Sequence, residues 1–299
     1  MLKQVLQVAS FGEVLWDMYP HDQKLGGAPA NFAYYCSQLG AKSSLISSVG
    51  RDPLGRKTLT QLACQGIHAD HVQVHPLLPT GTCHVALNNH GEARFSLAER
   101  VAWDEIHFTE AIQTMLTHVD IFYFGSLVQR SPISKATLQQ CLCKLPATCL
   151  KIFDVNLRPP CVSLDPIVQS LKICDVLKLN HEELSALTNM LTLDGTTREK
   201  ILELRKRFDI AIIALTLGED GSLLCGADEL FHISPASSIQ VLDTVGAGDA
   251  FAAALAIGLA QHKTPQQLHP LANAIGGHVC SQDGAMVALP PTLLEPFKF

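Results

Sequence analysis

The sequence is poor in charged residues and lacks long apolar runs. Charged side chains make up 17% of its 299 residues, and the formal net charge at pH 7 is −6. Because no basic surface results, we expect no nucleic-acid partner, and a phosphorylated ligand must be held by local groups. The apolar runs, residues 250–260 included, are shorter than the ~20 residues that a membrane-spanning helix needs. We therefore expect no association with a membrane.

Cysteine is too dilute for a disulfide scaffold, since ten cysteines are spread over 299 residues. Most of them lie in apolar segments, as Cys36 and Cys174 do, and are expected to be reduced residues of the core. Cys141, Cys143 and Cys149 form a cluster whose spacing fits no zinc site. Residues 1–4 lead directly into a strand-like segment and leave no room for a signal peptide, so a cytoplasmic protein is expected.

Three common nucleotide-binding patterns are missing from the chain. It contains neither the P-loop pattern G-x-x-x-x-G-K-[ST] nor the glycine loop of protein kinases with its partner lysine. It also lacks G-x-G-x-x-G after the first expected strand, where residues 11–14 read F-G-E-V. A nucleotide is therefore not held as in P-loop enzymes or protein kinases, and a nicotinamide oxidoreductase is disfavoured.

Short apolar runs alternate with segments of helical spacing. The runs predict strands at residues 5–11, 43–49, 121–124, 149–155, 176–179 and 211–217. Helical spacing lies between them, for example at residues 30–39, 54–65 and 132–145. This alternation predicts a single α/β domain over residues 1–299, with three layers and a mostly parallel central sheet. Ligands of such sheets bind at the C-terminal ends of the strands.

Two segments depart from this alternation, residues 14–19 and 81–98. In the second, residues 82–87 and 93–97 flank the turn N-N-H-G, which predicts a β-hairpin. A hairpin inserted into an α/β chain is either an edge extension of the main sheet or a separate small lid.

Residues 243–251, D-T-V-G-A-G-D-A-F, have the features of an anion site. The turn Gly246-Ala247-Gly248 lacks bulky side chains, and the first N–H groups of the helix expected after it are unpaired. A phosphate there meets these N–H groups and the positive end of the helix dipole. Asp249 beside it has the position of a base that takes a proton from an attacking hydroxyl. The alternative is a tight turn before a helix.

The motifs of the chain resemble those of the ribokinase-like sugar kinases, also called PfkB carbohydrate kinases, whose C-terminal signature looks like D-T-x-G-A-G-D. The other matching motifs stand in the family's order: G-E-V-L-W-D at 12–17, G-G-A-P-A-N at 26–31, L-G at 39–40, V-G-R-D-P-L-G at 49–55, F-D-V-N-L-R-P at 153–159, K-L-N-H-E-E at 178–183 and T-L-G-E-D-G at 216–221. Several independent motifs in order are a strong signal. The resemblance implies the ribokinase-like fold with a β-lid, formed by about residues 13–20 and 80–100, and a homodimer through this lid.

The resemblance also implies which residues bind the sugar. They are Asp17, Gly26, Gly27 and Asn31. The carboxylate of Asp17 suits a diol, and the amide of Asn31 both donates and accepts. Without the family match, a capping acid and turn glycines would explain the same residues. Arg94 would reach the sugar from the lid, with a cross-strand surface pair as its alternative.

Arg158, Asn180 and Glu183 are expected near the transferring phosphoryl group. The planar fork of Arg158 suits phosphate, and a surface ion pair is the alternative. In the family, the N-x-x-E pattern of Asn180 and Glu183 is associated with magnesium and phosphate, and Glu183 is expected to act through water. The same two residues fit a helix N-cap with an acid in the first turn, and both roles are compatible.

The nucleotide contacts and a cation site follow from the resemblance alone. The residues expected against ATP are Thr216, Gly218, Gly221 and Asn273. Asp243, together with backbone carbonyls near Val245 and Ala285, resembles the family's monovalent-cation site, which would bind K⁺.

The expected activity is an ATP- and Mg²⁺-dependent transfer of phosphate to a primary hydroxyl of a monosaccharide. The sequence G-A-P-A-N at 27–31 resembles fructokinases, whereas ribokinases place a lysine after the glycine pair and ketodeoxygluconate kinases an aspartate. Residues 79–82 and 102–104 point the same way. Fructose is therefore the expected substrate. The alternatives are a kinase for ribose, ketodeoxygluconate or adenosine, and a non-catalytic sugar-binding regulator.

Overall fold

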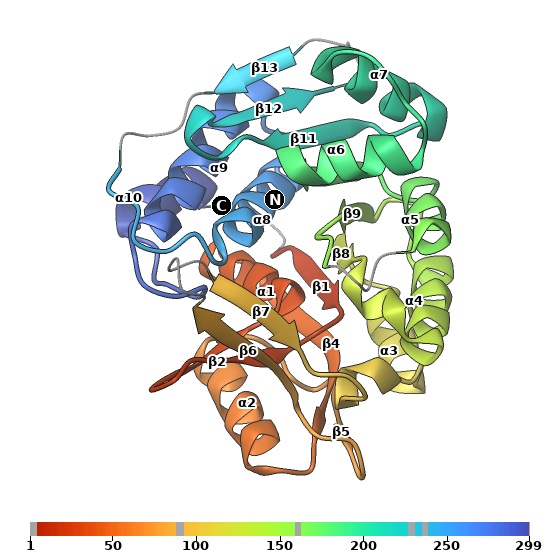
Figure 1. Cartoon of the computed structure of the whole chain (residues 1–299), viewed down its shortest axis with the longest axis vertical. Coiled ribbons are helices and arrows are strands. Elements are labelled where there is room, and N and C mark those ends of the chain that lie inside the picture. Colours follow the sequence, from red (N-terminus) through yellow and green to blue (C-terminus); the bar gives the residue numbers. More distant parts are fainter. Residues whose placement is uncertain (1–4, 88–92, 159–162, 227–230, 235–238, 299) are drawn as a thin grey trace.

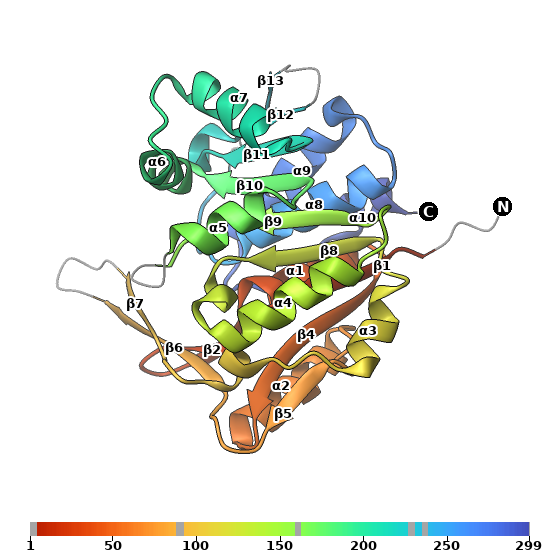
Figure 2. The ribbon, with the colours of Figure 1, turned by 90° about the vertical axis from the view of Figure 1, so that its right-hand side faces the viewer.

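Two β-sheets organise the chain, one of nine strands and one of four (Figures 1 and 2). They are seen in a computed structural model that describes residues 5–87, 93–158, 163–226, 231–234 and 239–298. The order of strands in the large sheet is β13-β12-β11-β10-β9-β8-β1-β4-β5. Neighbours pair in parallel from β11 to β5, and β12 and β13 add antiparallel pairs at one edge.

All six strands predicted from apolar runs lie in this sheet. They are β1 (Gln7–Phe11), β4 (Lys42–Gly50), β8 (Ile121–Gly125), β9 (Leu150–Asp154), β10 (Val176–Asn180) and β11 (Ile212–Thr216). The sequence did not predict three short strands at the two sides of the sheet, which are β5 (Val72–His75), β12 (Ser222–Cys225) and β13 (Phe231–Ser234). The mostly parallel sheet is confirmed.

Helices cover both faces of the large sheet, which confirms the three-layer α/β/α class. One core cluster lies under α1 (Ala28–Gln38), α2 (Pro53–Cys64), α8 (Ala247–Ala260), α9 (Pro265–Cys280) and α10 (Pro291–Leu294). The other lies under α3 (Glu110–Leu116), α4 (Pro132–Lys144), α5 (Leu164–Leu171), α6 (His181–Met190) and α7 (Thr197–Phe208). None of the helices in these described segments is long and apolar enough to cross a membrane.

Helix α8 is buried between its neighbours α1 and α9 (Figure 1). Residues 250–258 are all buried, so this helix has no solvent-facing stripe. Its small side chains allow the close packing, since a Cβ atom on Gly258 would lie 2.1 Å from Leu268 Cδ1. The N-terminus of α8, where the expected anion site lies, is therefore held rigidly by the core.

The small sheet has the order β3-β2-β6-β7 and is separate from the large one. Its strands are β2 (Leu15–Met18), β3 (Gln23–Gly26), β6 (Gly81–Leu87) and β7 (Ala93–Leu97). The hairpin of β6 and β7 was predicted, although its turn at residues 88–92 lies outside the described residues. β3 was not predicted, because four residues carry too little alternation. The sheet stands off the edge toward which the parallel strands run (Figure 2), so it is a separate unit, as the lid alternative expected.

Candidate active site

The N-terminus of α8 and the loops after β1, β9 and β10 meet at this edge of the large sheet. Gly246 caps α8 with a left-handed φ of 81°. The N–H group of Ala247 donates to the Thr244 carbonyl at 3.3 Å. In the described part of the chain, the N–H groups of Gly248 and Asp249 donate to no acceptor. Two free N–H groups at a helix N-terminus are suited to an anion.

Other groups of the protein lie where side chains on the two glycines of this turn would be. A Cβ atom on Gly246 would lie 2.4 Å from the carbonyl oxygen of Ala285. A Cβ atom on Gly248 would lie 2.9 Å from Lys178 Nζ. The approach of an anion is therefore not the only reason for glycine here, since Ala285 O excludes a side chain at Gly246 and Lys178 Nζ lies close to the place of one at Gly248.

Asp249 lies in the first turn of α8 and is oriented by a side chain from α1. Asn31 Nδ2 donates to Asp249 Oδ2 at 2.8 Å. Burial raises the pKa of Asp249 to about 7, with a further contribution from the carboxylate of Asp154, while Lys178 and the Asn31 hydrogen bond oppose the rise. A carboxylate with a pKa near neutrality is suited to accept a proton at physiological pH.

Asp154 and Lys178 form a buried ion pair that the sequence analysis missed. Lys178 Nζ lies 3.1 Å from Asp154 Oδ2, and the Tyr123 hydroxyl donates to the same oxygen at 3.1 Å. The side chains of Lys178 and Asp154 are 8% and 1% exposed. Burial lowers the pKa of Lys178, but nearby carboxylates, Asp154 foremost, outweigh it and raise the pKa, so the ammonium stays charged. The available signal was a lysine between the apolar residues of β10 and an aspartate at the end of β9.

Asn180 and Glu183 form a capping box at the start of α6. Asn180 Oδ1 accepts the Glu183 N–H at 2.8 Å, and Glu183 Oε2 accepts the Asn180 N–H at 2.8 Å. Glu183 Oε1 also accepts the N–H of Leu157 at 3.1 Å, which ties the loop after β9 to α6. Burial raises the pKa of Glu183, and Lys178 opposes this rise. The capping alternative is therefore confirmed, and a metal-binding role would be additional.

Asp17 lies in β2, opposite Lys24 of β3. Its carboxylate lies over Gly26, since a Cβ atom there would be 2.7 Å from Asp17 Oδ2. It accepts no hydrogen bond from the residues that the structure describes. Burial, together with the nearby Asp243, raises its pKa to about 6. Gly27, at φ 107°, would bring a Cβ atom to 2.6 Å from the Glu13 carbonyl oxygen.

Glu13 is a second site residue that the sequence analysis did not assign. It follows β1 and is 3% exposed. Its Oε2 atom has no hydrogen-bond partner in the described part of the protein. Burial raises its pKa to about 7; the nearby Asp249 adds to this rise, and the positive charge of Arg158 opposes it. A buried carboxyl with an unsatisfied oxygen is costly to the fold, and such groups are common at functional sites.

The structure describes the side chain of Arg158 but not that of Arg94. Arg158 is exposed after β9, and its positive charge lowers the pKa values of Asp249, Asp17 and Glu13. The backbone of Arg94 lies in β7, but its side chain is outside what the structure describes.

The residues expected against the nucleotide lie between the end of β11 and the start of β12, and within α9. Thr216 ends β11, and its hydroxyl donates to Leu179 O at 3.5 Å. Gly218 and Gly221 have φ angles of 61° and 90°, and a Cβ atom on Gly218 would meet no atom within 4 Å. Gly218 therefore faces open space.

Asn273 of α9 has its amide engaged by the protein. Its Oδ1 accepts from the Ser222 hydroxyl at 2.6 Å, and its Nδ2 donates to Ser234 O at 2.8 Å. The side chain thereby ties α9 to β12 and β13.

Asp243 holds the two loops of the expected cation site together. Its Oδ1 accepts the Val245 N–H at 3.0 Å, and its Oδ2 accepts the Gly284 N–H at 3.1 Å. The adjacent carbonyl oxygen of Ala285 accepts from the Tyr35 hydroxyl at 2.7 Å. Among the described residues, no group of three or more acidic, histidine or cysteine side chains converges as a metal site would require.

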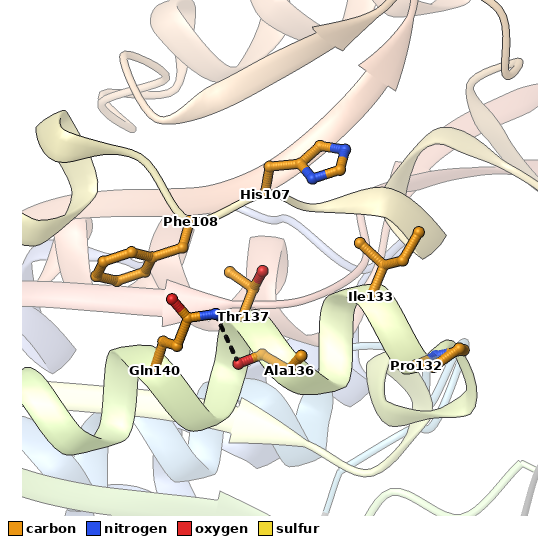
Figure 3. A pocket seen from close by; sticks show the side chains of 7 residues that line it. All are labelled: His107, Phe108, Pro132, Ile133, Ala136, Thr137 and Gln140. Atoms are coloured by element: carbon orange, nitrogen blue, oxygen red, sulfur yellow. Dashed lines mark hydrogen bonds between the residues drawn. The ribbon is translucent and has the colours of Figure 1, made fainter.

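A surface groove elsewhere in the molecule lacks the charged residues found at this edge of the large sheet (Figure 3). It lies between the segment before α3 and helix α4, and His107, Phe108 and Ile133 are among its lining residues. None of the residues lining it is a carboxylate, lysine or arginine. Its helix packs on the face opposite to α8, so the groove is not a candidate for the active site.

The fold and this edge of charged side chains define an α/β phosphotransferase. Residues 14–292 match the pfkB family of carbohydrate kinases. The chain belongs to this family, as the motifs predicted, and is a carbohydrate kinase.

Relatives are found at moderate identity over nearly the whole length. A fructokinase of Klebsiella pneumoniae is 29% identical over 295 residues, which cover 93% of this chain and 94% of that protein. A sugar kinase of Pyrococcus horikoshii, solved in complex with ATP, superposes with a TM-score of 0.80 and 28% identity over 93% of this chain and 94% of that one. A fructokinase of Xylella fastidiosa superposes with a TM-score of 0.86 at 23% identity, covering 97% of both chains, which supports the fold.

Proposed function

We propose that this carbohydrate kinase transfers the γ-phosphoryl group of ATP to a primary hydroxyl of fructose. The position of Asp249 carries the proposal: it stands at the start of α8 beside free N–H groups, and Asn31 holds its carboxylate at 2.8 Å. The carboxylate takes the proton of the attacking hydroxyl, while the N–H groups stabilise the charge on the phosphoryl group. ATP as donor is supported by the Pyrococcus horikoshii sugar kinase, whose structure contains it.

Fructose is supported by the relatives and by the polar groups of the site. The Klebsiella pneumoniae relative is a fructokinase, and a Vibrio cholerae fructokinase has been solved with fructose, ADP and potassium ion. Asp17 offers a carboxylate with no partner among the described residues, and Asn31 offers a buried Oδ1 atom in the same condition. Both acceptors suit sugar O–H donors. Gly26 and Gly27 complete the proposed sugar site.

Gly246, Ala247 and Gly248 are proposed to cradle the transferring phosphoryl group, with Arg158 supplying positive charge from the loop after β9. Thr216, Gly218 and Gly221 are proposed to lie against ATP, where the open space at Gly218 leaves room for it. Both atoms of the Asn273 amide are already hydrogen-bonded within the protein. Asn273 is therefore proposed to border the ATP region through its backbone and its packing. Arg94 remains a proposed contact from the lid.

Magnesium and potassium belong to the proposal. Glu183 would hold Mg²⁺ through water, since both of its oxygens already accept backbone N–H groups. Mg²⁺ neutralises charge on the phosphates when it is bound with ATP. Asp243 and the carbonyl of Ala285 offer oxygen ligands of the kind that K⁺ takes, and the Vibrio cholerae fructokinase contains potassium.

We also propose that the chain is a single domain with the small sheet as its lid, and that two copies pair through this sheet. Light scattering on the purified protein measures the mass in solution. A monomer at working concentration would contradict the dimer and leave the kinase unaffected.

The decisive test is ADP release with fructose, ribose, ketodeoxygluconate, glucose and adenosine as acceptors. Fructose is expected to give the highest kcat/KM, and Asp249→Asn serves as the matched inactive control. A preference of more than about tenfold for ribose or adenosine would overturn fructose and leave the kinase standing. Absence of ADP release, with sugar binding seen by calorimetry, would instead support a non-catalytic regulator.

A further inference from the structure

We propose that Lys178 is a positioning residue for phosphoryl transfer, whose buried ammonium lies beneath the turn of Gly246, Ala247 and Gly248 and maintains the charge of Asp249. This inference rests on the proposed function. It concerns a residue of β10 to which no role in binding sugar, nucleotide or metal was assigned above.

The first observation is geometric. Lys178 Nζ occupies the space that a side chain on Gly248 would fill, 2.9 Å from the position of its Cβ atom. Gly248 also carries one of the free N–H groups of the turn. A fixed positive charge therefore lies directly against the backbone that is proposed to hold the phosphoryl group.

The second observation concerns how the ammonium is held. Asp154 Oδ2 and Oδ1 lie 3.1 and 3.3 Å from Lys178 Nζ, and Tyr123 donates to Asp154 from β8. An ammonium has three N–H groups. The Asp154 carboxylate is its only hydrogen-bonded partner among the described residues, so at least one N–H group remains for the side of the turn.

The third observation is that stability alone does not explain such a pair. Replacing a buried ion pair by apolar residues of similar size is often neutral or stabilising, because desolvation offsets the attraction. A comparison pair lies at the opposite ends of the same two strands: Lys151 of β9 and Asp175, which directly precedes β10, lie 2.7 Å apart and are 18% and 34% exposed. That pair borders solvent, far along the strands from α8, and provides a matched control.

The charges that face Asp249 come from several elements. The positive ones are Lys178 of β10 and Arg158 after β9, and the negative ones are Asp154 of β9 and Glu13 after β1. Lys178 lowers the pKa of Asp249 and Asp154 raises it. Removing the charge of Lys178 should therefore raise the pKa of Asp249, and removing the charge of Asp154 should lower it.

The experiment measures kcat/KM for the sugar from pH 5.5 to 9.5 in the wild type and in K178M, D154N and K151M. The midpoint of the acid limb should rise by about one pH unit in K178M, since a single nearby charge moves a carboxyl pKa by that order. It should fall in D154N and stay unchanged in K151M. Equal loss at every pH in K178M, or an unshifted midpoint in a folded protein, would overturn the proposal.

Gly248→Ala provides an independent variant in case K178M does not fold. Its methyl group meets Lys178 Nζ and should displace the ammonium, so the acid limb should again move upward. A G248A enzyme with the wild-type midpoint would contradict the proposal. Thermal melting of each variant verifies that the protein compared is folded.

A readout besides activity separates this inference from the proposed function. Carboxyl carbon NMR on protein labelled at aspartate follows the titration of Asp249, identified by the signal lost in D249N. If the wild type phosphorylates no sugar but the Asp249 titration rises in K178M, the proposed function fails and the role of Lys178 is supported. If the wild type is active and neither the titration nor the acid limb moves, the role of Lys178 alone is refuted.

Discussion

The raised pKa of Asp249 determines how turnover should depend on pH. With a pKa of about 7, the carboxylate is ionised in about half of the molecules at pH 7, about a tenth at pH 6 and about a hundredth at pH 5. Only the ionised form accepts a proton. We therefore expect kcat/KM to fall about tenfold per pH unit below neutrality.

Asp249→Asn should remove both the activity and its acid limb. General-base catalysis contributes on the order of 10²–10⁴-fold, and the amide does not accept the proton as the carboxylate does. Because Asn31 can still hydrogen-bond the amide oxygen, sugar and ATP binding should change little. ADP release at saturating Mg-ATP, with fructose varied from pH 5.5 to 9, measures both quantities.

Glu13 has a pKa of about 7 as well and is the necessary control. The acid limb should persist in Glu13→Gln and vanish in Asp249→Asn. If Asp249→Asn kept more than about a tenth of kcat, or if it retained the wild-type acid limb, Asp249 would not be the base. A limb lost in Glu13→Gln alone would transfer that role to Glu13.

Four further outcomes follow from particular contacts. Gly246→Ala places a methyl group against Ala285 O at a positive φ, and should lower the free energy of unfolding by ~1–3 kcal/mol in urea titrations. Glu183→Gln exchanges a charged acceptor of two N–H groups for an amide, and should cost about 1–3 kcal/mol by the same method. The pKa of Glu13 is raised to about 7 from 4.5, so its contribution to stability is present below pH 4.5 and is lost as pH rises to 7. Between pH 4.5 and 7, the free energy of unfolding of the wild type should fall by about 3 kcal/mol more than that of Glu13→Gln. An equal fall in the two proteins would contradict the burial of Glu13 as a neutral acid. Asp17→Ala should raise the sugar KM far more than the ATP KM, whereas equal changes in steady-state kinetics would place Asp17 outside the sugar site.

Much of the fold could be predicted because its signals are local. The apolar runs of β1, β4, β8, β9, β10 and β11 are strongly periodic or continuous, and burial on both faces of a parallel sheet leaves such runs in any sequence. The antiparallel strand β12 and the lid strand β3 have four residues each. Segments this short carry no period, and only pairing with a neighbour makes them strands.

The sequence by itself determined the class of protein, the glycine turn at residues 246–248 and the position of Asp249 at the start of a helix, because turn chemistry and capping depend on adjacent residues. Tertiary structure alone decided what surrounds that carboxylate. Asn31 donates to Asp249 across 218 positions of the chain, and Lys178 reaches the turn from a strand whose partner Asp154 lies 24 positions away. No local pattern encodes these contacts. Parallel strands and the helix packed on them bring distant residues to one edge of the sheet, where burial then raises the pKa of Asp249.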